Sequence, residues 1–133
     1  LLFCRPADWV AGTQEDGTRA TFTSPDGTSG LTVARVFRPN AIEDGEQLQS
    51  LQVMSELMAE QPGSPVASGE PVPEYFMGLL DAYVQWFQTD TGWIKVDTGT
   101  DSLGTVFVAA IQGSAYWVDG PLASGILESF TTQ

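Results

Sequence analysis

Hydrophobic and polar residues alternate along the first third of the chain, which is the pattern of half-buried β-strands. Residues 19–23 and 31–37 alternate in this way, and a Ser-Pro-Asp-Gly turn at 24–27 lies between them. A shorter run over residues 2–5, followed by Pro6, predicts a strand before these two. Three short strands at this spacing indicate an antiparallel meander.

The period changes to that of a helix in the second quarter of the chain. Leucine and methionine recur at steps of three or four residues, at Leu48, Leu51, Met54, Leu57 and Met58. Acidic and amide side chains fill most positions between them, and Gln-Pro-Gly at 61–63 ends the pattern. We expect an amphipathic helix over residues 42–60, with its leucines and methionines facing the sheet.

The middle of the chain is harder to assign. Residues 64–73 are rich in proline, glycine and serine and predict a loop. Residues 74–89 fit a helical spacing, yet from Gly78 the same stretch also alternates as a strand rich in β-forming residues. After the next turn, residues 93–96 fit either a short strand or the start of a loop that runs to Ser102.

The last thirty residues predict the clearest architecture. Residues 103–111 and 115–118 are two apolar runs rich in strand formers, and Gln-Gly-Ser at 112–114 separates them. This arrangement predicts a β-hairpin. A Gly-Pro pair ends the second run, and because proline suits the first turn of a helix, a short helix closing near residue 130 is expected.

Length and charge narrow the possible partners. The chain has 133 residues, which suits a single domain over 1–133 with one sizeable core. Its 17 acidic residues against 5 basic ones give a formal net charge of −12. This charge repels phosphate backbones and anionic lipid surfaces, so nucleic acid is a poor partner. No apolar run approaches the roughly 20 residues that cross a bilayer, so no transmembrane segment is predicted in this chain.

Candidate chemistry is sparse. The sequence contains no histidine, which removes the usual general base and the commonest transition-metal ligand. We therefore predict no catalytic residues, no cofactor and no enzyme activity. Asp97 and Asp101 flank a glycine and are either exposed turn residues or, as the weaker alternative, ligands for Ca²⁺. Trp93 is either a structural anchor or an exposed contact. The candidate partner contacts are Trp93, Asp97 and Asp101.

Cys4 is the single cysteine of the chain, so no internal disulfide can form. We expect its thiol to be buried in the first strand. The opening residues also invite a lipoprotein interpretation with Cys4 as the lipidated residue. Phe3 argues against that interpretation, because it is bulkier than the small residue that signal cleavage prefers.

The predicted succession of elements resembles the PsbP/Mog1/DcrB-like group of small α/β/α sandwiches. The matching parts are the opening segment to Trp9, the 22–33 meander, the 78–83 strand, Gly-Ser-Ala-Tyr at 113–116 and Ile-Leu-Glu-Ser-Phe at 126–130. A PsbP/Mog1-like fold implies an α+β domain, with a mainly antiparallel sheet of about six strands flanked by a long helix and a C-terminal helix. It also implies that residues 78–89 form a strand, which spacing alone does not show.

The resemblance carries a functional expectation, since members of that group are mostly non-enzymatic and many are exported. It implies a non-catalytic domain that binds another protein. Such a domain would be an exported or envelope-associated accessory subunit of a membrane complex, for example a photosynthetic complex. The expected compartment is extracytoplasmic (periplasmic, lumenal or cell-surface), with the cytoplasm as the alternative. Docking is expected through a sheet face or the 89–102 loop. Lys95 is the only lysine, so the basic docking mode of plant-type photosystem proteins is not implied.

The alternative function is a small-ligand or lipid-binding module. In this hypothesis an apolar groove lies between the 42–60 helix and the sheet. Its lining would consist of Met54, Met58 and Phe76.

Overall fold

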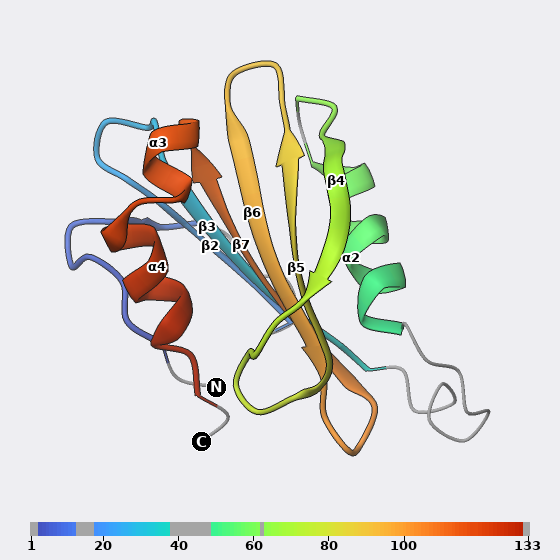
Figure 1. The fold of residues 1–133 in the computed structure, drawn as a ribbon. Helices are drawn as coiled ribbons and strands as arrows, with labels where there is room; N and C mark the ends of the chain where they lie inside the picture. The colour runs from blue at the N-terminus through green and yellow to red at the C-terminus, as the bar shows by residue number, and fades with distance from the viewer. Residues whose placement is uncertain (1–2, 13–17, 38–48, 62, 132–133) are drawn as a thin grey trace.

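The computed structural model describes residues 3–12, 18–37, 49–61 and 63–131, which form one antiparallel sheet with helices on both faces (Figure 1). The strands are β1 (Val10–Ala11), β2 (Arg19–Thr23), β3 (Gly30–Phe37), β4 (Val66–Pro73), β5 (Leu80–Gln88), β6 (Trp93–Thr100) and β7 (Thr105–Gly113). The helices are α2 (Gln49–Glu60), α3 (Ala115–Val118) and α4 (Pro121–Glu128). The strands lie in the order β1-β2-β3-β7-β6-β5-β4. The α+β class is confirmed, with seven strands in place of about six.

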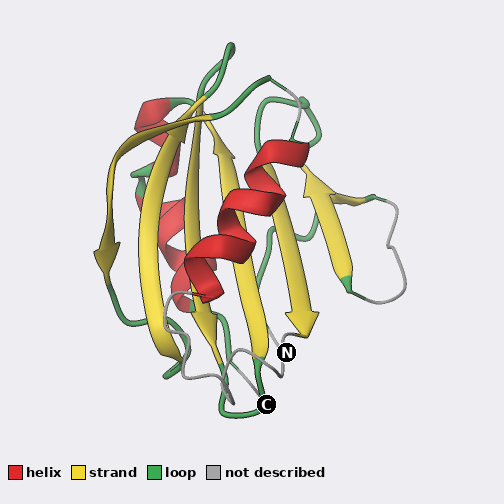
Figure 2. Ribbon diagram, turned by 90° about the vertical axis from the view of Figure 1, so that its right-hand side faces the viewer, coloured by secondary structure: helices red, strands yellow, loops and turns green. Residues whose placement is uncertain are grey.

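The α2 helix packs on one face of the sheet, where Figure 2 shows it crossing in front of the strands. Its buried side chains are Ser50, Val53, Met54, Leu57 and Met58. Three of them belong to the predicted stripe, and Leu51 of that stripe is partly buried against the same core. They pack against the inward-facing valines of the central strands, among them Val96, Val106 and Val108. Residues 42–48, the first part of the predicted helix, lie outside the described residues.

The α3 and α4 helices lie against the opposite face (Figure 1). There Ala123, Ile126 and Leu127 of α4 pack with apolar residues of β3 and β7. Because side chains alternate along a strand, β7 contributes to the cores on both faces of the sheet. Val106 and Val108 point towards α2, while Ala109 and Ile111 point towards α4. The sheet is therefore covered on both sides, and β7 between them is accordingly a nearly continuous apolar run from Val106 to Ile111.

The first predicted strand is wrong for its described residues. Residues 3–5 lie outside the sheet, and the structure has the two-residue β1 in place of the expected strand. The segment is instead tied to the end of the chain, because the Phe3 ring stacks on Phe130 at a centroid distance of 4.7 Å and the Cys4 N–H donates to Ser129 Oγ at 2.7 Å. Cys4 is exposed, so the expectation of a buried thiol is also wrong.

The predicted C-terminal hairpin is wrong as well, although the closing helix is confirmed as α4. The first run forms the long strand β7, but residues 115–118 form the short helix α3. Ser114 explains the difference: it is the N-cap, and its Oγ accepts a hydrogen bond from the Trp117 N–H at 3.2 Å. The Trp117 ring also stacks on Trp9 at 5.7 Å, and Trp9 is buried in the core on the α4 side of the sheet.

Two of the uncertain middle segments are strands of the sheet. Residues 80–88 form β5, so the strand that the resemblance implied is confirmed against the helical spacing. Residues 93–100 form β6, which pairs with β5 and β7 along its length, so the expected docking loop over 89–102 is wrong.

The predicted loop over 64–73 is wrong, because residues 66–73 form β4. This strand lies at the end of the sheet order and pairs with β5. An edge position tolerates prolines such as Pro71 and Pro73, because their missing N–H groups need not serve a second neighbour. No helix within the described ranges is both long enough and apolar enough to cross a membrane.

Candidate functional site

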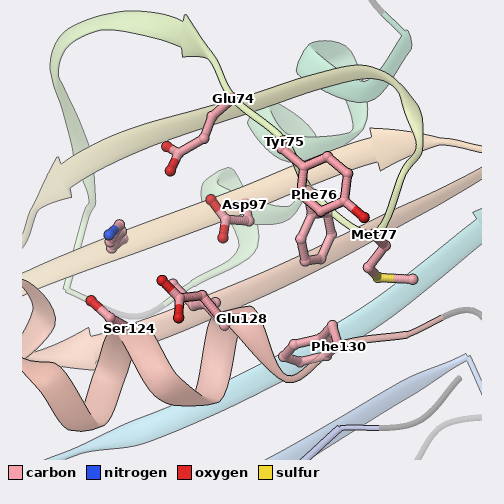
Figure 3. Close-up of a pocket in the computed structure, with 10 residues that line it drawn as sticks. Glu74, Tyr75, Phe76, Met77, Asp97, Ser124, Glu128 and Phe130 are labelled. Atoms are coloured by element: carbon pink, nitrogen blue, oxygen red, sulfur yellow. The ribbon is translucent and has the colours of Figure 1, made fainter.

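A pocket of about 160 Å³ lies between α4, β6 and residues 74–77, on the α3/α4 face of the sheet (Figure 3). We call it the Asp97 pocket. Its polar lining consists of Glu74, Lys95, Asp97, Ser124 and Glu128. Its apolar lining consists of Tyr75, Phe76, Met77, Leu127 and Phe130.

The segment that closes one side of the pocket, residues 74–79, is folded into a tight turn. The Leu79 N–H donates to the Phe76 carbonyl at 3.0 Å, and Met77 and Gly78 both have positive φ angles, of 58° and 71°. A left-handed methionine is uncommon, and such conformations persist only where the surroundings hold them. The strained turn therefore places residues 74–77 over the sheet.

Gly99 of β6 makes room for this segment. A Cβ atom added to Gly99 would lie 2.8 Å from Cβ of Leu79, closer than side chains pack. The Glu74 N–H also donates to the Ala82 carbonyl at 3.1 Å, which ties the start of the segment to β5. Backbone contacts and a missing side chain thus determine the distance between the segment and the sheet.

Asp97 forms the floor of the pocket. It lies in the middle of β6, opposite the buried Val84 of β5 and Ala109 of β7, and its side chain is only 8% exposed. Its carboxylate has no hydrogen-bond or ion-pair partner within the part of the chain that the structure describes, and Figure 3 shows it pointing into the pocket. Burial raises the pKa of Asp97 to about 7, Glu74 adds to this increase, and Lys95 opposes it.

Glu74 and Glu128 stand on opposite sides of the pocket, one from the 74–79 segment and one from α4 (Figure 3). Lys95 contributes the opposite charge, but its ammonium lies 5.3 Å from the centre of the Trp86 ring, within the range of a cation–π interaction. Trp86 is itself fixed, because its Nε1–H donates to Asp119 Oδ1 at 3.0 Å. The pocket therefore has three carboxylates and one ammonium, and it is net acidic.

The other end of the pocket is apolar. Phe76 and Phe130 are both buried, with ring centroids 5.8 Å apart, and Leu127 lies beside them. Tyr75 is 82% exposed and extends the aromatic lining to the surface. A ligand in this pocket would meet an acidic end and an aromatic end.

The structure separates the three predicted partner contacts. Asp97 lies in the pocket, whereas Asp101 lies in the β6–β7 turn, about 13 Å further along the chain at strand spacing. Asp101 stabilises that turn, because its Oδ1 accepts hydrogen bonds from the N–H groups of Leu103 and Thr105, both at 2.9 Å. Trp93, at the other end of β6, is partly buried against the α4-side core and lines a separate hollow of about 170 Å³. Its side chain thus packs partly on that core and partly borders the hollow.

The Ca²⁺ alternative finds no support in the geometry. Residues 97–100 belong to β6, so Asp97 and Asp101 do not share a loop. Within the described residues no group of three or more acidic or cysteine side chains is placed to hold a metal ion.

The apolar groove predicted for the alternative, ligand-binding function is wrong, because its three expected lining residues do not lie together. Met54 and Met58 are buried in the α2-side core, whereas Phe76 is buried in the α4-side core, on the other face of the sheet. These three side chains therefore cannot line one groove. The described part of α2 packs closely on the sheet through its own stripe.

Sequence reasoning missed most of the pocket. Glu74, Glu128 and Phe130 come from segments far apart in the chain, and tertiary packing alone brings them to Asp97. One signal was present: in β6, Lys95 and Asp97 alternate with Ile94 and Val96, which placed two charges on one face of a strand.

Comparisons with known proteins do not assign a family. No family model matches the chain, and no curated protein matches it. Among solved structures, one from Bacteroides thetaiotaomicron VPI-5482 has a TM-score of 0.44 and 13% sequence identity, and it covers 96% of this chain and 41% of that chain. This chain thus spans about two fifths of that protein's length. The resemblance to the PsbP/Mog1/DcrB-like group stays a prediction.

Proposed function

We propose that this protein is a non-catalytic protein-binding domain that docks its partner over the Asp97 pocket. One observation carries the proposal: Asp97, a residue only 8% exposed, has a carboxylate that opens into a pocket without a partner among the described residues. Burying an ionisable group without compensation is costly, so such a group is typical of a site completed by another molecule. The partner supplies the missing cationic group.

The size of the pocket supports a protein partner over a free small molecule. Sites for drug-sized ligands usually measure about 300–1,000 Å³, whereas the Asp97 pocket measures about 160 Å³. A pocket of this size holds one anchoring side chain, and such anchors contribute much of the affinity of protein interfaces. Tyr75 at its edge offers an exposed aromatic surface for the remainder of the contact.

Charge supports the same proposal. The chain carries a net charge of −12, so a partner with a basic docking surface would be drawn to it. Ser124 contributes an aliphatic hydroxyl to the pocket, and the sequence has no histidine that could activate it as a nucleophile. The role of an exported or envelope-associated accessory subunit of a membrane complex, acting outside the cytoplasm, belongs to this proposal and is supported by the sequence resemblance.

Site-specific crosslinking tests the proposal. A photoreactive phenylalanine analogue would replace Tyr75 at the pocket edge or, in a matched control, Asp90 in the exposed β5–β6 turn. After irradiation in the native host, including its detergent-solubilised membranes, we expect a discrete protein adduct from position 75 and none from position 90. The Glu128→Lys variant should abolish the adduct, while Asp90→Lys should leave it. Equal adducts from both positions, or none, would refute docking at this face.

A further inference from the structure

We infer that the group inserted into the Asp97 pocket is the primary ammonium of a lysine side chain of the partner protein. The inference rests on the proposed function and names the occupant of the same site. Three features of the pocket carry it: the buried carboxylate at its floor, the two acids beside its mouth, and the apolar surface that leads to them.

The floor of the pocket suits a compact cation. Asp97 is 8% exposed, points into the pocket and has no partner among the described residues. An ammonium is a point charge with three rotatable donors, so it can reach a single deep carboxylate from any direction. A guanidinium is planar and is best matched by two coplanar acceptors. One buried carboxylate therefore favours lysine over arginine.

The mouth of the pocket suits a cation carried on a chain rather than a bare ion. Glu74 and Glu128 lie on its two sides, but together with Asp97 they do not form a group that could hold a metal ion within the described residues. Lys95 also lines the pocket, and its charge opposes a divalent ion more strongly than a monovalent one. An ammonium held by Asp97 gains from the field of both glutamates without requiring direct contact with them.

The volume and apolar surface suit the stem of the same side chain. A cavity of about 150 Å³ can hold benzene, which has six heavy atoms. The Asp97 pocket, at about 160 Å³, thus accommodates the four carbons and the nitrogen of a lysine side chain. Phe76, Met77 and Phe130 form the apolar surface on which the carbons would lie. Lysine stems commonly pack on apolar surface while their charge finds a polar partner.

The test uses n-butylammonium, which reproduces the stem and head of lysine, and n-butylguanidinium as the matched competitor. Each is titrated into ¹⁵N-labelled protein at pH 8 and constant ionic strength, and binding is followed by amide chemical shifts. We expect n-butylammonium to saturate on the order of 1–10 mM, as its few atoms allow, with shifts confined to residues around the pocket. n-Butylguanidinium should bind at least about fivefold more weakly.

Variants then assign the site. Asp97→Asn should weaken n-butylammonium binding at least about tenfold, because it removes the charge on the floor, while Asp90→Asn should leave it unchanged. If Asp97→Asn does not fold, Glu128→Gln replaces it, with a loss of about two- to fivefold that diminishes in high salt. Equal or tighter binding of n-butylguanidinium, the absence of saturation, or an unchanged dissociation constant for the folded pocket variant would overturn the inference.

The two proposals fail separately. If position 75 crosslinks to a protein but n-butylammonium is not preferred, protein docking stands and the lysine occupant is refuted. If n-butylammonium binds through Asp97 but position 75 captures no protein, the pocket binds a free amine, and both protein docking and the protein-borne lysine are refuted.

Discussion

Replacing Asp97 by asparagine is expected to remove a pH dependence of the folding stability that the buried carboxyl group causes. Asp97 is buried without a partner among the described residues, and its pKa rises from 3.8 to about 7 on folding. Asparagine has nearly the same shape but cannot ionise. The variant therefore keeps the packing of the pocket floor and removes the titration.

The sign and size of the effect follow from the two pKa values. Between pH 3.8 and about 7 the folded protein holds a proton on Asp97 that the unfolded chain has lost, so stability falls as pH rises. The contribution is fully present below pH 3.8 and is lost by the time the pH has passed about 7. At about 1.4 kcal/mol per pH unit, the wild type should lose about 3 kcal/mol from this group between pH 5 and pH 8.

Urea unfolding followed by far-ultraviolet circular dichroism measures the effect. The range begins at pH 5 because the sequence pI is about 4.1, where solubility is lowest. The other acids titrate in both proteins, so the difference in unfolding free energy between Asp97→Asn and wild type isolates this residue. Asp90→Asn, at an exposed turn, is the matched control and should follow the wild-type profile.

We expect the difference in unfolding free energy to grow between pH 5 and pH 8, in favour of Asp97→Asn, by about 3 kcal/mol. Parallel stability profiles, with a difference constant to about 0.5 kcal/mol from pH 5 to pH 8, would show that Asp97 is charged and solvated throughout. A difference of the opposite sign would show that the carboxylate has a favourable partner in the folded state.

Three further substitutions test the packing around the sheet by urea unfolding. Ser50→Ala removes a fully buried hydroxyl that lies 2.5 Å from the Asp81 carbonyl oxygen and 3.0 Å from Asp81 Oδ2, and should cost about 1–3 kcal/mol; a neutral effect would contradict a hydrogen bond to Asp81. Gly99→Ala places a Cβ against Leu79, so it should lower the unfolding free energy by about 1–3 kcal/mol and weaken n-butylammonium binding. Unchanged binding would show that the position of the 74–79 segment does not determine the shape of the pocket. Ile111→Ala, fully buried in β7, should cost about 2–5 kcal/mol, and a loss under 1 kcal/mol would argue against this core.

Alternation of apolar and polar residues predicted β2 and β3 from the sequence, and the three- to four-residue spacing of leucine and methionine predicted the amphipathic stripe of α2. β5 was ambiguous because both its faces are covered: Phe87 packs on the α2 side, while Val84 and Trp86 point to the other face. A strand buried on both faces loses the alternation that distinguishes it from a helix.

The remaining errors arose where tertiary contacts override local preference. Residues 115–118 are strand formers by composition, yet a Ser114 cap and the stacking of Trp117 on Trp9 support a helical turn. The stretch 66–73 forms a strand despite its prolines, because an edge strand pairs on one side only and the missing proline N–H groups can face away from the sheet. The pocket could be predicted only as far as Asp97, because no spacing rule links it to Glu74 or Glu128.

The position of β7 has a consequence for how the chain folds. β7 is the last strand of the sequence, yet it lies between β3 and β6 and pairs with both along their lengths. The β1–β3 block and the β4–β6 block cannot join until it is in place. During synthesis the edge of β3 that pairs with β7 therefore stays unpaired while residues 38–104, about half of the chain, are made. The non-local pairing places folding among the slower classes, in milliseconds to seconds. A chaperone that shields this edge would act at the step where aggregation competes most with folding.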